Sequence, residues 1–278
     1  MRTDTFERSC EHWSEAGRRE MEDFYTLATV DYRHLAESRD WRTWFEARQA
    51  SAGDRSIRLL DVACGSGKFP AALLRHANFS QAAIQPLRYD LLDPAAFSIR
   101  EARAALAPPF VPGEEFEMTL QAFTGTGYDV VWATHALYAV PEAELNAALE
   151  RFLAALAPDG RGFIAHSADA GHYIEFYRRF LADFRDGSGT PYTGAERIQA
   201  TLEALGAEVA TTTLRYDNGV PESEHDRVRG FLQRCAFDDS VTLDAMLAAR
   251  NVGPYLRDRV VDGYWRFPQQ VLLMEVSR

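Results

Sequence analysis

The stretch Leu59–Phe69, LLDVACGSGKF, decides how this sequence folds. An apolar run ends in Asp61, the small residues Ala63, Gly65 and Gly67 follow, and a helix-like segment begins after them. A parallel strand passes into a helix in this way where a nucleotide-like ligand lies across the turn. The small residues let the backbone approach a ligand and adopt positive φ where the turn needs it. Asp61, at the carboxyl end of the strand, is placed to hold a cationic amine or an ordered water.

Composition limits the chain to one large α/β domain, or a core domain with a modest extension. It has 278 residues, of which 46% are hydrophobic, so it can bury a sizeable core. No apolar run is long enough for a membrane span, and the charged residues 1–8 do not resemble a secretion signal. We therefore expect no membrane association.

The net charge and the cysteines limit the classes of substrate and cofactor that we expect. The net charge is −11 and Lys68 is the only lysine, which argues against a nucleic-acid substrate because phosphate backbones need clustered cations. A small molecule, or a protein side chain, is the natural substrate. Cys10, Cys64 and Cys235 lack metal-ligand spacing, so we expect no metal site and a reducing, cytoplasmic location.

Strand and helix patterns alternate after an N-terminal helical segment. Residues 6–48 are predicted to be helical, 49–54 a linker and 107–113 a loop. Strands are predicted at 57–62, 87–92, 116–120, 128–133, 162–165, 208–216 and 270–276. Helices are predicted at 69–77, 95–106, 142–156, 170–184, 194–205, 226–233 and 242–249. This alternation predicts βαβ units and a parallel sheet.

The pattern Asp-x-Ala-x-Gly-x-Gly at 61–67 resembles motif I of the class I S-adenosylmethionine-dependent methyltransferases. It matches the dinucleotide fingerprint less well, because Pro70 stands where a third glycine would be. The resemblance implies a Rossmann-like α/β sandwich, whose mostly parallel seven-stranded sheet has an antiparallel last strand. It also implies S-adenosyl-L-methionine as cofactor. We expect a helical lid at 1–55 and a methyltransferase domain at 56–278, with a helical insert at about 222–264.

A cofactor site of this kind needs a carboxylate after the second strand for the ribose hydroxyls. Asp90 and Asp93 both qualify by type. Asp90 lies inside the apolar run, whereas Asp93 ends it and precedes Pro94, which opens a helix. Strand-edge position favours Asp93, which also suits a helix N-cap.

Two further loops follow strands at the same edge of the sheet. After the third strand, Gln121 and Ala122 are expected to meet the adenine, with Phe123 stacking on it; turn chemistry alone would also explain this segment. After the fourth strand, we expect Thr134 to contact the cofactor. His135 and Tyr138 in that loop are candidate catalytic residues.

The mechanism expected from the cofactor is in-line attack on a sulfonium methyl group, with water excluded. An amine acceptor must be neutral, which a desolvated aromatic pocket favours. An oxygen or imidazole acceptor would gain from a base, for which His135 is the first candidate, followed by His166 and His172. The predicted substrate-binding residues are Tyr25, Tyr32, His166 and Tyr173. Tyr25, Tyr32 or Trp44 are candidates for contact with the sulfonium, although helix packing also explains them.

A further resemblance is to the histamine N-methyltransferase-like branch. It rests on the spacing from Gly67 to Asp93-Pro94 and on the segments 135–140 (HALYAV), 191–193 (PYT) and 229–237 (RGFLQRCAF). Where that family has an amide after strand four this chain has His135, and its second paired tyrosine is Ala139 here. Its substrate glutamate has no unambiguous match among Glu15, Glu20 and Glu22. These differences favour an acceptor other than histamine.

The sequence thus predicts methyl transfer from S-adenosylmethionine to a small molecule at nitrogen, by a monomer or homodimer. The alternatives are O-methylation of a carboxylate or hydroxyl, methylation of a protein residue, and a regulatory protein that binds the cofactor without turnover.

Overall fold

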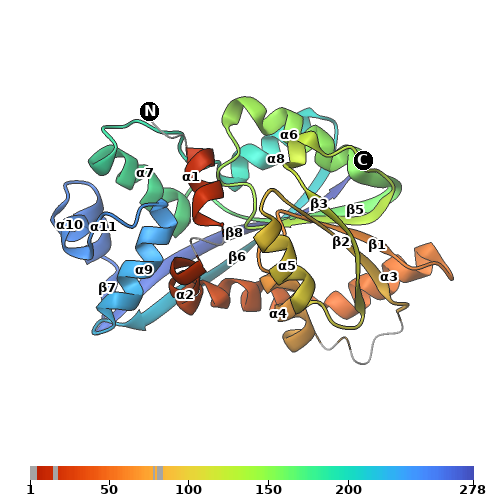
Figure 1. The fold of residues 1–278 in the computed structure, drawn as a ribbon, viewed down its shortest axis with the longest axis horizontal. Helices are drawn as coiled ribbons and strands as arrows, with labels where there is room; N and C mark the ends of the chain where they lie inside the picture. Colours follow the sequence, from red (N-terminus) through yellow and green to blue (C-terminus); the bar gives the residue numbers. More distant parts are fainter. Residues whose placement is uncertain (1–4, 15–17, 78, 80–83) are drawn as a thin grey trace.

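The computed structural model describes residues 5–14, 18–77, 79 and 84–278. A single mixed sheet runs through the centre, with helices on both faces (Figure 1). The strands are β1 (Arg58–Val62), β2 (Leu87–Asp93), β3 (Phe110–Glu117), β4 (Tyr128–Thr134), β5 (Leu156–Ser167), β6 (Glu208–Pro221), β7 (Val260–Val261) and β8 (Tyr264–Ser277). Their order is β3-β2-β1-β4-β5-β8-β6, with β7 paired to β8.

Strand directions confirm the predicted fold class. Strands β1 to β5 pair in parallel, and β8 runs antiparallel between β5 and β6. The helices are α1 (Thr5–His12), α2 (Arg18–Glu37), α3 (Trp41–Ala52), α4 (Lys68–His76), α5 (Ala96–Ala105), α6 (Glu142–Ala155), α7 (His172–Phe184), α8 (Ala195–Ala204), α9 (His225–Ala236), α10 (Leu243–Ala248) and α11 (Val252–Arg257). Because the first five strands are parallel, their carboxyl ends meet at one edge of the sheet.

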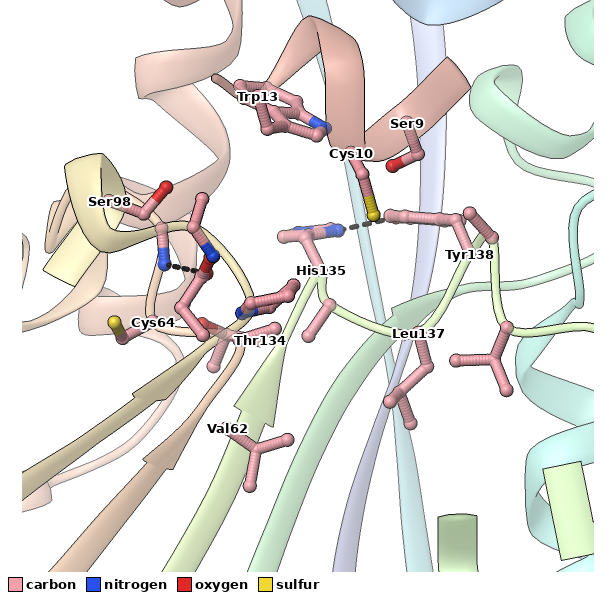
Figure 2. A pocket seen from close by; sticks show the side chains of 18 of the residues that line it. Ser9, Cys10, Trp13, Val62, Cys64, Ser98, Thr134, His135, Leu137 and Tyr138 are labelled. Carbon is pink, nitrogen blue, oxygen red and sulfur yellow. Dashed lines mark hydrogen bonds between the residues drawn. The ribbon is translucent and has the colours of Figure 1, made fainter. Parts of the chain in front are cut away.

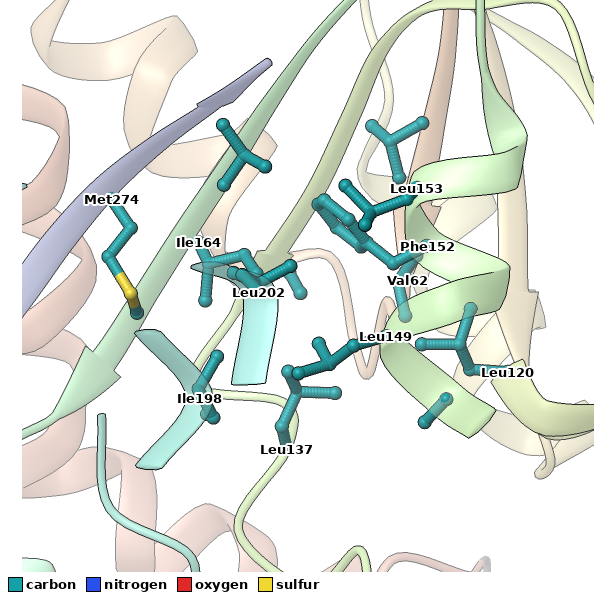
Figure 3. Close-up of a cluster of buried hydrophobic side chains, with 14 of the residues drawn as sticks. Val62, Leu120, Leu137, Leu149, Phe152, Leu153, Ile164, Ile198, Leu202 and Met274 are labelled. Atoms are coloured by element: carbon teal, nitrogen blue, oxygen red, sulfur yellow. The ribbon is translucent and has the colours of Figure 1, made fainter. Parts of the chain in front are cut away.

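Separate apolar cores cover the two faces of the sheet. Helices α6 and α8 bury leucine, isoleucine and phenylalanine side chains against one face, with Phe152 and Met274 fully buried (Figure 3). On the other face, Trp41 and Phe45 of α3 pack edge-on against Trp132 of β4. Helix α3 is therefore an integral part of the sandwich.

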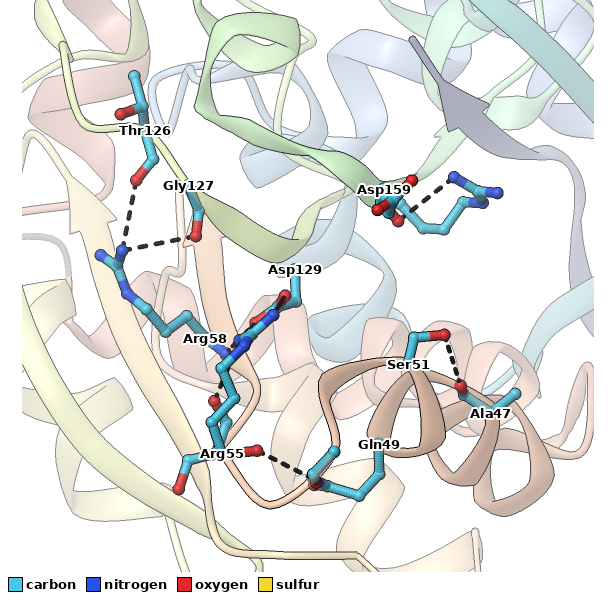
Figure 4. Close-up of polar contacts among 12 residues, drawn as sticks. Ala47, Gln49, Ser51, Arg55, Arg58, Thr126, Gly127, Asp129 and Asp159 are labelled. Carbon is cyan, nitrogen blue, oxygen red and sulfur yellow. Dashed lines mark hydrogen bonds and ion pairs between the residues drawn. The ribbon is translucent and has the colours of Figure 1, made fainter.

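The segment between α3 and β1 is tied to the edge of the sheet opposite the carboxyl ends. The two terminal guanidinium nitrogens of Arg55, Nη1 and Nη2, each donate to the Asp129 carboxylate at 2.6 Å. The backbone N–H of Arg58 donates to the same carboxylate at 2.9 Å (Figure 4). The predicted linker at 49–54 is wrong for most of its length, because α3 continues to Ala52. Gln49 stabilises this end by donating to the carbonyl oxygens of Gly53 and Arg55.

Strand β3 differs most from its prediction. It begins at Phe110, which pairs with Leu87, so the predicted loop at 107–113 is wrong in its second half. Pro112 lacks an N–H, but β3 lies at the edge of the sheet, where a missing donor is tolerated. The strand ends at Glu117, and the residues that follow it form a 3-10 turn, η3 (Leu120–Ala122).

Helices α9 to α11 lie in the chain between β6 and β8. Strands β6 and β8 are longer than predicted, reaching Pro221 and beginning at Tyr264, so the insert joins the far end of their hairpin. Helix α2 packs against both α4 and the insert helix α9. Figure 1 shows α1 and α2 lying between α5 on one side and α7 and α9 on the other. Helix α2 therefore connects the side of the molecule that carries α4 with the side that carries α9.

Candidate functional site

A cavity of about 240 Å³ lies at the carboxyl ends of β1, β2 and β4. The turns after these strands form its base, α7 and α9 contribute to its side, and α1 and α2 cover it. Figure 2 shows Ser9 and Cys10 of α1, and Trp13 just after it, facing the loop that carries His135 and Tyr138. The strand-edge position predicted for the site is where the structure has this cavity.

Helix α1 is held over the cavity by polar contacts with distant elements. Arg8 donates to the Tyr177 hydroxyl of α7 at 2.8 Å. Arg234 of α9 is buried and donates to the His12 carbonyl oxygen at 2.5 Å. These contacts close the cavity on its α1 side.

The glycine turn has the conformation that its sequence predicts. Ala63, Gly65 and Gly67 all have positive φ, of 50°, 51° and 69°. A side chain on Gly65 would meet nothing within 4 Å, so this glycine leaves open space for a ligand. A Cβ on Gly67 would lie 2.9 Å from the Ala102 backbone, so Gly67 is required for packing of α4 against α5. Beyond their shared positive φ, Gly65 therefore provides space at the turn, whereas Gly67 allows two helices to pack closely.

Asp90 and Asp93 have different surroundings. Asp93 lines the cavity and accepts hydrogen bonds from the backbone N–H groups of Gly65 at 3.1 Å and Ala95 at 2.9 Å. Burial raises the pKa of Asp93 to about 6. Asp90 is fully buried within β2 and accepts from the Tyr128 hydroxyl at 2.9 Å and the Glu114 N–H at 2.8 Å. Asp90 therefore stabilises the sheet, and Asp93 is available to a ligand.

Asp61 lies at the cavity with its carboxylate buried against β2. It accepts a hydrogen bond from the Tyr89 hydroxyl at 2.7 Å. Burial raises the pKa of Asp61 to about 7, because little compensates for the desolvated charge. In the folded protein the Asp61 carboxyl therefore stays protonated at pH values at which an aspartate in the unfolded chain has already lost its proton.

The Asp61 proton gives a testable dependence of stability on pH. An unfolded aspartate has a pKa of about 3.9. Between about pH 4 and 7 the folded state binds more protons at this site, so Asp61 lowers the free energy of unfolding as pH rises. We measure the free energy of unfolding in urea without ligand. As pH rises from 5 to 8, we expect this free energy for Asp61→Asn to increase relative to that of wild type by at least about 1 kcal/mol. Exposed Asp159→Asn should follow wild type, whereas a constant offset for Asp61→Asn would contradict this assignment.

His135 and Tyr138 form a hydrogen-bonded pair after β4. His135 Nδ1 lies 2.6 Å from the Tyr138 hydroxyl oxygen, drawn as a dashed line in Figure 2. Burial lowers the pKa of His135 to about 3 and raises that of Tyr138 well above its ordinary value, so both stay neutral. The pair is satisfied when Tyr138 donates to Nδ1, which leaves the imidazole hydrogen on Nε2. Nε2 is buried without a hydrogen-bond partner in the described structure.

His135 also has a left-handed backbone, with φ of 53°. Positive φ is uncommon outside glycine and is often stored at functional sites. Ala63 and His135 both adopt it, directly after β1 and directly after β4. Two of the three turns at the base of the cavity, those after β1 and β4, therefore contain a non-glycine residue in the left-handed region.

The structure brings three predicted tyrosines to the cavity, namely Tyr25, Tyr32 and Tyr173. The ring centroids of Tyr32 and Tyr173 lie 5.9 and 6.2 Å from that of His135. Trp44 does not reach the cavity; it packs against Phe45 of its own helix. Glu15 and the side chains of Glu20 and Glu22 lie outside the described structure.

The remaining residues predicted to contact the cofactor divide into two groups. Thr134 and Gln121 line the cavity, and the Gln121 amide donates to Glu144 at 2.8 Å. Ala122 is exposed and does not line it, because the 3-10 turn points its side chain away. Phe123 does not line it either and packs edge-on against Phe116 in the core.

The two remaining histidine candidates are core residues rather than cavity residues. His166 is fully buried behind Tyr138, and its Nε2 is 2.9 Å from the Thr193 carbonyl oxygen. His172 is fully buried, with Nδ1 2.8 Å from the Tyr255 hydroxyl. Burial lowers the pKa of His166 to about 4 and that of His172 to about 3. The prediction of His166 as a substrate contact is therefore wrong for this structure.

Asp31 is a cavity residue that sequence reasoning missed. It lies on α2, is 2% exposed, and accepts a hydrogen bond from the Tyr173 hydroxyl at 2.5 Å. The sequence contains a signal for it, since Leu27, Ala28 and Leu35 place Asp31 on the buried stripe of the helix. An acid on such a stripe needs a polar partner.

The described residues contain neither a metal-binding cluster nor a membrane-spanning helix. No cluster of three or more histidine, cysteine, aspartate or glutamate side chains is arranged to hold a metal ion. Within the same residues, no helix combines the length and apolarity needed to cross a bilayer.

Comparison with known proteins places this fold in a family. The sequence model of the methyltransferase-domain family matches residues 32–212. No curated protein sequence matches the chain. Similar solved structures include magnesium protoporphyrin IX methyltransferase from Synechocystis PCC 6803 with bound S-adenosylhomocysteine. It is 13% identical, with a TM-score of 0.55, over 96% of this chain and 97% of that one.

Two other structures share the fold at similarly low identity. A putative methyltransferase from Bacillus halodurans C-125 is 16% identical, with a TM-score of 0.53, over 83% of this chain and 97% of that one. The plantazolicin methyltransferase BpumL, in complex with S-adenosylhomocysteine, is 13% identical, with a TM-score of 0.51, over 99% and 95%. The family match covers more than half of the chain and agrees with the motif at 61–67. The chain belongs to the methyltransferase-domain family and is a class I S-adenosylmethionine-dependent methyltransferase.

Proposed function

We propose that this protein transfers the methyl group of S-adenosylmethionine to a nitrogen atom of a small molecule. One observation carries the proposal: a single cavity joins the glycine turn and Asp93 to a wall of tyrosines beneath α1 and α2. A covered cavity of this size suits a small acceptor better than a protein side chain presented on a surface.

The residues at the strand edge fit the cofactor. Gly65 leaves open space beside the turn, and Asp93 presents a carboxylate next to it. We assign cofactor binding to Asp61, Ala63, Gly65, Gly67, Asp93, Gln121 and Thr134, all but Gly67 lining the cavity. Gly67 acts by positioning the turn. When bound, the cofactor supplies an electrophilic methyl group on a sulfonium.

The acceptor side is aromatic and contains a neutral histidine. Tyr25, Tyr32 and Tyr173 exclude water and present ring faces that favour a cationic sulfonium nearby. A group with a pKa of about 3 is a weak base, so we propose that His135 positions the acceptor through Nε2 rather than removing a proton from it. A neutral nitrogen can attack before it loses a proton, whereas a hydroxyl gains from a base that removes its proton. A site without a strong base therefore suits nitrogen better.

The N-terminal helices and the insert complete the proposed site. We propose that α1 and α2, within residues 1–55, act as a lid, and that the insert at about 222–264 contributes Arg234 and Cys235 to the acceptor side. The acceptors named for similar structures, magnesium protoporphyrin IX and plantazolicin, differ greatly from each other. The fold therefore leaves the acceptor open, and the residues of this cavity carry the proposal.

The test is incubation of the protein with methyl-labelled S-adenosylmethionine and a small-molecule extract, followed by mass spectrometry. A labelled product whose fragmentation places the methyl group on nitrogen supports the proposal. Label on oxygen would favour the O-methyltransferase alternative. S-adenosylhomocysteine binding without label in any small molecule would favour a protein acceptor or a regulatory protein.

A further inference from the structure

Asp31 has one carboxylate oxygen that nothing in the described protein satisfies. Oδ2 accepts the Tyr173 hydroxyl at 2.5 Å, whereas Oδ1 is buried without a hydrogen-bond partner. A buried carboxylate oxygen without a donor lowers stability, and native structures keep such groups where another role requires them. Asp31 also lines the cavity, so a bound molecule can reach it.

Among the side chains that the structure describes, no cationic group lowers the pKa of Asp31. The groups that lower its pKa are the neutral side chains of Tyr173, Asn218 and Tyr216, while burial outweighs them and raises the pKa to about 6. The cationic groups of the cavity lining have other contacts. The Lys68 ammonium lies 4.5 Å from the centre of the Tyr25 ring, and Arg234 donates to a backbone carbonyl of α1.

The side chains around Asp31 are neutral polar groups and aromatic rings. Asn218 Oδ1 and the Tyr216 hydroxyl, on β6 beneath α2, are buried without a hydrogen-bond partner in the described structure. Tyr32 and Tyr173 contribute rings that line the cavity. The Asp31 carboxylate and the ring faces that line the cavity together stabilise a desolvated cation.

We propose that Asp31 binds the ammonium group of an amine-bearing acceptor. This inference rests on the proposed function and names its substrate class. A protonated nitrogen has no lone pair, so the anchored amine is a recognition group and the methylated atom is a second, neutral atom of the same molecule. The acceptor is therefore a small molecule with one basic amine and a separate, neutral nucleophilic nitrogen.

Calorimetry with matched probes tests this without turnover. The probes are benzylamine and 2-phenylethylamine, each paired with the alcohol of the same carbon skeleton, titrated into protein saturated with S-adenosylhomocysteine. At about pH 7.5 both the amines and Asp31 are charged. We expect wild type to bind at least one amine about tenfold or more tightly than its alcohol, and Asp31→Asn to reduce that ratio to within about twofold. Asp31→Asn still accepts the Tyr173 hydrogen bond through its amide oxygen.

Two variants separate an anchor from a contact that merely holds α2 in place. Tyr173→Phe removes the hydrogen bond but keeps the charge, so the preference for amines should persist. Glu37→Gln removes an exposed charge from the same helix and should behave as wild type. Equal affinity for amines and alcohols in wild type, an unchanged ratio in Asp31→Asn, or an equal loss in Tyr173→Phe would each overturn the proposal. Amine preference without methyl transfer would instead count against the proposed function alone.

Discussion

Replacing Asp93 with alanine is expected to weaken S-adenosylhomocysteine binding about 10- to 100-fold, measured by calorimetry. A hydrogen bond to a charged group contributes about 1.5–3 kcal/mol, which corresponds to this range. The carboxylate of Asp93 is fixed at the strand edge by the N–H groups of Gly65 and Ala95, so it is already positioned for the ribose contact that we propose. Its loss also frees the turn at Gly65. Asp93→Asn keeps an acceptor oxygen and should lie between wild type and alanine.

Asp90→Asn is the matched control, three residues away on the same strand. Its carboxylate accepts from Tyr128 and from the N–H of Glu114, and an amide satisfies only part of this set. We expect a loss of about 1–3 kcal/mol in the free energy of unfolding, with cofactor affinity within about twofold of wild type. The reverse pattern, with Asp90→Asn losing affinity and Asp93→Ala binding normally, would exchange the two assignments.

The sequence predicted the parts of this protein that local signals determine. The turn at 61–67 combines a buried strand, an acid and small residues within a few positions, so its conformation and its place at the cavity follow from neighbouring residues. Strand-edge position likewise favoured Asp93 over Asp90, and Asp93 is the one that lines the cavity; its contact with the ribose stays a prediction. Helix and strand alternation then determined the sheet class, because parallel strands need helical crossovers.

The errors lie where distant contacts decide the outcome. Strand β3 resembled a loop because it contains Pro112 and Gly113, and only its pairing with β2 makes it a strand. Gly113 is required there because a Cβ would lie 1.9 Å from the Asp90 carboxylate. Side-chain direction in a loop is equally non-local, which is why the predictions for Ala122 and Phe123 failed. Asp31 was missed because its contact with Tyr173 spans 142 positions in the sequence.

His135 is the residue for which substitution should affect turnover most without affecting cofactor binding. Its ring is held between Tyr32 and Tyr173, and its Nδ1 is engaged by Tyr138, so Nε2 is fixed relative to the cavity. A fixed Nε2–H donor that binds an acceptor atom other than the attacking nitrogen aligns the nucleophile with the methyl group and leaves its lone pair free. A misplacement of about 1 Å in such alignment costs about 100-fold in rate. Because the pKa of His135 is about 3, its own titration should produce no loss of activity between about pH 5 and 9.

The substitution must respect the backbone at this position. Alanine is strained at a φ of 53°, whereas asparagine tolerates the left-handed region, so His135→Asn removes the imidazole with little disturbance of the turn. We expect kcat to fall about 100-fold, with S-adenosylhomocysteine affinity within about twofold of wild type. Tyr138→Phe keeps the imidazole but leaves Nδ1 without its donor, so its kcat should lie between the two. Equal losses of kcat and cofactor affinity in His135→Asn would show that His135 supports the fold of the cavity rather than the acceptor, because a residue that positions only the acceptor leaves the cofactor side intact.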